Sequence, residues 1–118
     1  MGKRSRRRGR EPLQAPNVDY ADAEGNVLTL RTVLSPATRR EYASVAAGSP
    51  LSQEDAWHRA VEFLFERLAV RWTVAGLPLE RQAELLGRLR MASQPERAWV
   101  RDRLREHAAE FFPELDAP

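Results

Sequence analysis

The sequence predicts a mainly α protein, a small four-helix bundle preceded by a short β-hairpin and a disordered basic N-terminal tail. Three observations lead to this fold class. Apolar residues recur at helical spacing through most of the chain after residue 35. Proline, glycine and capping residues divide that part into four segments of helical length. The first ten residues, by contrast, carry six positive charges and nothing apolar after Met1 to bury.

The chain of 118 residues has the size of one domain, with residues 1–16 as tail and linker and residues 17–118 as a single folded unit. It contains no cysteine, which excludes disulfide frameworks, thiol nucleophiles and cysteine-based zinc sites. No apolar run is long enough to span a bilayer, and the basic N-terminus lacks the apolar core of a signal peptide. We therefore expect a cytoplasmic protein without membrane contact.

The formal net charge of +2 combines two parts of opposite sign. The tail holds six of the 19 basic residues, and all 17 acids follow it, so residues 11–118 carry a net charge of −4. Six clustered cations attract a polyphosphate without reading its bases, so we expect weak, non-specific contact with RNA or DNA. A solubilising terminus is the alternative. The expected contact residues are Lys3, Arg4, Arg6, Arg7, Arg8 and Arg10.

Residues 18–34 predict the β-hairpin. Gly25 and Asn26 form a turn signal, because both residues tolerate a positive φ. The residues that follow are rich in β-branched types and alternate between two faces, as in a half-buried strand. A lone hairpin is only marginally stable, so we expect this one to lie on the helices or to pair with an edge strand of another chain.

Four helices are predicted, over residues of about 36–47, 53–75, 79–91 and 95–111. Their starts are marked by Ser35–Pro36, by Ser52 with Asp55, by Pro78, and by Ser93 with Glu96. Gly48 and Gly76 are predicted to end the first and the second helix. Short connections between the helices are typical of a compact bundle.

The helix over residues 53–75 is predicted to be the centre of the bundle. Large apolar side chains cover more than one side of it, and Trp57, Leu64 and Trp72 share one stripe. Replacement of Trp57 by alanine is therefore expected to cost about 3–5 kcal/mol of stability.

Three residues on these helices are candidate contacts for a partner. Arg67 and Arg71 fall on the apolar part of the second helix. Either their stems lie on apolar surface while the guanidiniums reach water or a carboxylate, or they form a partly buried cationic pocket for an anion or an acidic partner. Trp99, on the fourth helix, belongs either to the bundle core or to an interface as an exposed anchor.

The two histidines are the candidates for chemistry. His58 shares helix faces with Asp55 and Glu62, and His107 stands three residues before Glu110, but neither follows the Glu-x-x-His order of two-metal bundles. We therefore expect no metal and no other cofactor. His107 lies in an apolar stripe, which is typical of a core histidine with one ring nitrogen bonded to a carbonyl or carboxylate. No phosphate loop, nucleophile elbow or paired inward carboxylate accompanies it, so we do not expect an enzyme.

These observations predict a small non-catalytic adaptor that binds a partner protein and whose basic arm contacts nucleic acid or a ribonucleoprotein. One alternative is a helical chaperone or assembly factor that covers an apolar segment of another protein; a less supported one is an enzyme or metal protein using His58 or His107. A homodimer is compatible with each. The layout of a short Leu- and Thr-rich strand followed by amphipathic helices is similar to that of small tail-assembly chaperones of bacteriophages, without a residue motif behind the likeness.

Overall fold

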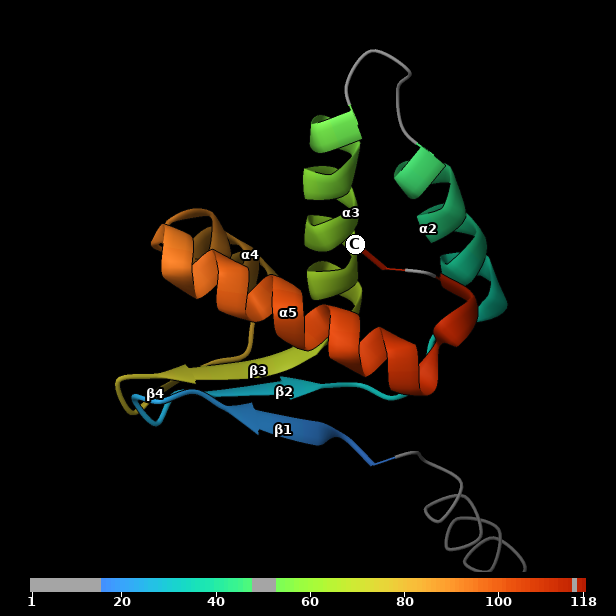
Figure 1. The fold of residues 1–118 in the computed structure, drawn as a ribbon. Helices are drawn as coiled ribbons and strands as arrows, with labels where there is room; N and C mark the ends of the chain where they lie inside the picture. Colours follow the sequence, from blue (N-terminus) through green and yellow to red (C-terminus); the bar gives the residue numbers. More distant parts are fainter. Residues whose placement is uncertain (1–15, 48–52, 116) are drawn as a thin grey trace, which may run out of the picture.

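The fold combines a β-sheet with helices and is not the predicted four-helix bundle (Figure 1). The computed structural model describes residues 16–47, 53–115 and 117–118. Within these residues, four antiparallel strands form one sheet in the order β1-β2-β3-β4, and four α-helices accompany it. The prediction of a mainly α bundle is therefore wrong, because part of the expected helical region pairs with the N-terminal hairpin.

The sheet is a meander in which each strand pairs with its neighbour in sequence. The first hairpin lies where the sequence predicts it: β1 (Val18–Ala21) and β2 (Val27–Leu30) pair antiparallel across the turn. On its other edge, β2 pairs with β3 (Ala69–Val74), and β3 pairs in turn with β4 (Leu77–Leu79). The hairpin thus obtains its third strand from its own chain.

The predicted helix over residues 53–75 is wrong in its last part. Helix α3 (Gln53–Leu68) ends at Leu68, and β3 begins at the next residue. Arg31, just after β2, holds this junction: its backbone N–H donates to the Leu68 carbonyl at 2.8 Å, and its guanidinium donates to the Arg67 carbonyl at 3.0 Å. A cation on the last helical carbonyls also favours the negative end of the helix dipole.

The turn between β3 and β4 lies where the sequence predicts the end of one helix, at Gly76, and the start of the next, at Pro78. Gly76 does not end a helix; Ala75 and Gly76 have φ of 52° and 82°, the two positive values of a type I′ hairpin turn. The Ala75 N–H donates to the side-chain oxygen of Asn26 at 2.9 Å, so the neighbouring hairpin turn supports this one. Pro78 does not begin a helix either, since it lies in the edge strand β4, where a missing N–H is tolerated.

The other predicted helices lie close to their expected places: α2 (Pro36–Ala47), α4 (Gln82–Arg90) and α5 (Gln94–Phe111). The Ser93 capping box of α5 is confirmed, with Ser93 and Glu96 bonding each other's backbone N–H groups. A short 3₁₀ helix, η2 (Pro113–Leu115), follows α5. The predicted signals at Gly48 and Ser52 lie outside the described residues.

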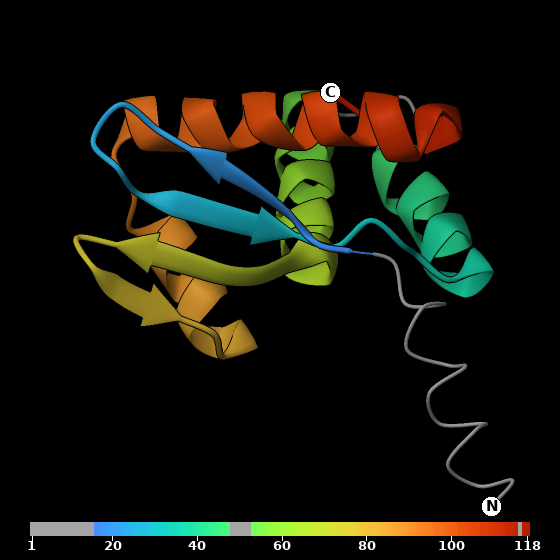
Figure 2. The ribbon, with the colours of Figure 1, turned by 90° about the horizontal axis from the view of Figure 1, so that it is seen from below.

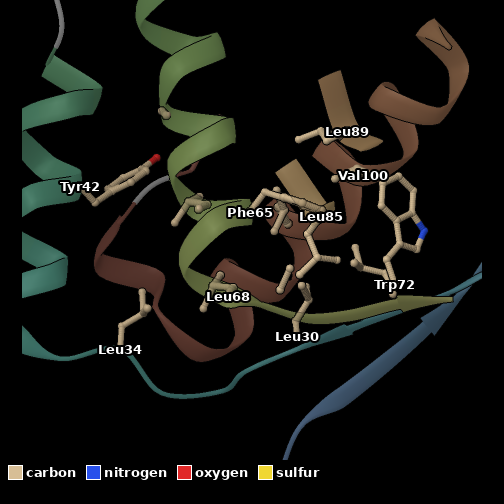
Figure 3. Close-up of a cluster of buried hydrophobic side chains, with 14 of the residues drawn as sticks. Leu30, Leu34, Tyr42, Phe65, Leu68, Trp72, Leu85, Leu89 and Val100 are labelled. Carbon is tan, nitrogen blue, oxygen red and sulfur yellow. The ribbon is translucent and has the colours of Figure 1, made fainter. Parts of the chain in front are cut away.

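The described helices lie on one face of the sheet, and none of them covers the opposite face, which points toward the reader in Figure 2. Helix α5 crosses the sheet, while α2 and α3 stand side by side and extend away from it (Figure 1). The core lies between the layers, where Leu30 and Trp72 of the sheet meet Phe65, Leu85 and Val100 of the helices (Figure 3). None of the described helices is long and apolar enough to cross a membrane.

Candidate functional site

A groove of about 720 Å³ lies between α2, the beginning of α3 and the C-terminal segment, which comprises Glu114, Leu115, Ala117 and Pro118. Its apolar lining comes mainly from Tyr42, Ala43, Ala46, Trp57 and Leu115. Its polar lining consists of Arg39, Arg40, Gln53 and Glu114. Mixed linings with a few polar groups around an apolar centre are typical of binding sites.

Trp57 is the most informative residue of this groove. Its side chain is 49% exposed, so the prediction that it belongs to the core is wrong. The buried side of α3 instead carries Ala56, Ala60 and Leu64. Trp57 lies in the first part of α3, which extends away from the sheet (Figure 1), so the sheet does not cover it. A large aromatic side chain that is half in water at a groove is typical of a protein-binding anchor.

Arg39 fixes the wall of the groove at the α2 side. Its guanidinium pairs with the Glu114 carboxylate at 2.9 Å and lies over the Phe112 ring at 5.4 Å from the centroid. This contact ties the C-terminal segment to α2. The neighbouring Arg40 is exposed, and no ion pair joins it to any residue that the structure describes. The groove thus has one neutralised and one available cation.

The two predicted cationic candidates do not form a common pocket in the described residues. Arg67 lies over the Phe63 ring at 4.8 Å and 3.5 Å from the Glu41 carboxylate. Arg71 is on β3 rather than on a helix, and its guanidinium is 3.4 Å from Glu80. Each guanidinium therefore reaches its own carboxylate near the surface, which is the first of the two interpretations of the sequence.

Trp99 lies at the edge of the core rather than in the groove. It is partly buried against the hydrophobic cluster, and the Arg103 guanidinium lies over its ring at 5.5 Å. Arg103 in turn pairs with Glu106 at 2.8 Å. Since one ring face carries a guanidinium and the side chain packs on the core, the structure favours the core interpretation over the exposed anchor.

His107 is the buried polar residue that the sequence analysis places in the core, and this prediction is confirmed. Its Nε2 lies 2.6 Å from the Arg31 carbonyl, and its Nδ1 lies 2.8 Å from the Tyr20 hydroxyl. A carbonyl only accepts, so Nε2 carries the proton and Nδ1 accepts from Tyr20 in the neutral ring. Burial lowers the pKa of His107 and raises that of Tyr20, and Glu110 raises the Tyr20 pKa further.

Among the residues that the structure describes, neither histidine belongs to a cluster of possible metal ligands. His58 is exposed on α3, and no group of three or more possible metal-binding side chains occurs among the described residues. Both ring nitrogens of His107 are used within the fold, where they join α5 to β1 and to the end of β2. His107 therefore holds the layers together in this arrangement.

Sequence reasoning missed the groove. Its residues come from three separate segments, and the spacing of Trp57 relative to Leu64 and Leu68 predicts a core position for it. The six tail cations, the other predicted binding residues, lie outside the described residues. No family model, no curated protein sequence and no solved structure matches the chain.

Proposed function

We propose that this protein is a non-catalytic interaction module that binds a segment of a partner protein in the groove beside Trp57. The half-exposed indole carries the proposal, because burying a large aromatic side chain on binding yields more affinity than burying most other residues. Tyr42, buried between α2 and α3 (Figure 3), gives the groove a firm floor. A preformed site loses little conformational entropy when a ligand binds.

The basic arm has a separate part in this proposal. Residues 1–10 add a long-range attraction to polyphosphates, and the groove supplies the selectivity for a protein. The alternative of a chaperone or assembly factor also requires a surface that binds an apolar segment of another protein. This alternative stays a prediction, because the groove fits both functions.

Selection of short peptides from a random displayed library on the full chain tests the groove. We expect the selected peptides to lose at least about tenfold in affinity for the Trp57→Ala variant, measured as Kd by fluorescence anisotropy. Met91→Ala is the matched control, since Met91 is also large, apolar and exposed (84%) but does not line the groove.

Equal binding of the selected peptides to the wild type and to Trp57→Ala would refute the proposal. Thermal unfolding of each variant, followed by circular dichroism, shows that the fold is retained. A half-exposed residue contributes little to the core, so this control is expected to give similar curves for both variants.

A further inference from the structure

The shape of the groove limits the form of its occupant. Helices α2 and α3 stand side by side and extend away from the sheet (Figure 1). The α2 residues that line the groove run from Arg39 to Ala46, a rise of about 10 Å, or roughly two helical turns. A short helix laid along this pair would form a third helix of the same layer, which is a common way to fill such a groove.

The apolar centre of the groove limits the side chains that can enter it. Ala43 and Ala46 are three residues apart on α2, so both methyl groups face the same side. Trp57 of α3 lines the same space and is half exposed. Small residues beside a large exposed ring leave room for bulky apolar side chains from outside, spaced three or four residues apart.

The charge of the groove points to an acidic occupant. Its one acidic side chain among the described lining residues, Glu114, already pairs with Arg39 at 2.9 Å. Arg40 is exposed in the lining and forms no ion pair with any described residue. A carboxylate brought next to Arg40 would therefore gain an attraction that no described group of this chain satisfies.

We infer that the groove binds an amphipathic helical segment with bulky apolar residues at i and i+3 or i+4 and an aspartate or glutamate about one turn further, beside Arg40. This inference rests on the proposed function and names its ligand chemistry. The apolar residues pack on Ala43, Ala46 and Trp57, and the carboxylate pairs with the Arg40 guanidinium. A nucleic-acid ligand for Arg40 is the competing outcome.

The peptides selected on the wild-type chain provide the test. We expect them to share an apolar pair at helical spacing followed by an acidic residue, and to bind the Arg40→Glu variant at least about tenfold more weakly. Exchange of that acidic residue for lysine should restore much of the binding to Arg40→Glu. Arg97→Glu is the matched control, because Arg97 is exposed, forms no ion pair among the described residues and does not line the groove.

The outcomes separate this inference from the proposed function. Peptides that depend on Trp57 but bind wild type and Arg40→Glu equally would overturn the acidic ligand and leave the groove as a protein-binding site. Peptides independent of Trp57 would overturn both. Loss of binding of a single-stranded RNA oligonucleotide in Arg40→Glu, with unchanged peptide binding, would assign Arg40 to nucleic acid and also overturn the inference.

Discussion

The neutral form of His107 fits its surroundings better than the charged form. In the neutral ring, Nε2 donates to the Arg31 carbonyl and Nδ1 accepts from Tyr20. In the charged ring, Nδ1 also becomes a donor, so the Tyr20 hydroxyl must turn its own proton elsewhere. The ring is fully buried, and Phe111 and Phe112 lie beside it. Burial therefore lowers the pKa of His107, while the hydrogen bond to the Arg31 carbonyl and the charge of Glu110 oppose part of this effect.

This lowered pKa predicts a pH-dependent stability. The unfolded chain has a histidine pKa of about 6.5 and binds the proton first as the pH falls, so the free energy of unfolding decreases from there towards the folded pKa. Above about pH 7.5 the contribution is fully present. Urea unfolding between about pH 7.5 and 5.5 measures the slope. The His107→Gln variant should lose most of this slope while His58→Gln retains it; equal slopes in the wild type and His107→Gln would contradict the assignment.

Trp57 and Trp72, which the sequence places on one stripe of a single helix, are expected to contribute differently to the stability of the protein. Trp72 is 2% exposed and meets Phe65 edge to face, so Trp72→Ala should cost about 3–5 kcal/mol. Trp57→Ala should cost about 1 kcal/mol or less, because the side chain is half exposed. Chemical denaturation of both variants compares the two values, and similar losses would mean that Trp57 belongs to the core.

At the scale of elements, the sequence contains clear signals for helix ends and weak ones for the sheet. Ser93 with Glu96 and Pro36 are local signals, and the helices they predict are present. The sequence predicts a helix where β3 lies, because Trp72 continues the helical spacing of Leu64 and Leu68. Valine and threonine around Trp72 favour a strand, but the partner strand β2 is about forty residues away, and such pairing is invisible to local periodicity.

The β3–β4 turn gives a prediction at this scale. Ala75 has a φ of 52°, a conformation that asparagine adopts more readily than alanine and that precedes Gly76 in a type I′ turn. Ala75→Asn is therefore expected to stabilise the protein by about 0.5–1 kcal/mol. Ala83→Asn, on the exposed side of α4, is the matched control and should destabilise slightly. A lower melting temperature for Ala75→Asn would contradict the turn geometry.

For the whole molecule, charge is divided between the first ten residues and the rest. The tail carries six cations and the remainder a net charge of −4. This division could be read from the sequence, because it requires only counting. The groove could not be predicted from the sequence, because Arg39 and Glu114 come together only where the C-terminal segment packs beside α2. Contacts between residues so far apart in the sequence follow from the topology of the chain, which local sequence patterns do not give.

Removal of residues 2–10 tests the role of the tail. Six cations predict that the logarithm of the binding constant for an RNA or DNA oligonucleotide falls with the logarithm of salt concentration with a slope of about −5. We expect the truncated chain to lose this binding and its salt dependence, as measured by filter retention. Replacement of Ser5 and Gly9 by alanine is the matched control, because it leaves every cation in place. Unchanged retention after truncation would remove the tail from the proposed function.

Helix α3 passes into β3 between Leu68 and Ala69 without a linking residue. Its far end lines the groove with Gln53 and Trp57, and the strand that continues it lies in the middle of the sheet. The two walls of the groove are therefore mechanically unequal. Tilting α3 to widen the groove would strain the hydrogen bonds between β2 and β3, whereas moving α2 would break the ion pair of Arg39 with Glu114 and that of Arg67 with Glu41.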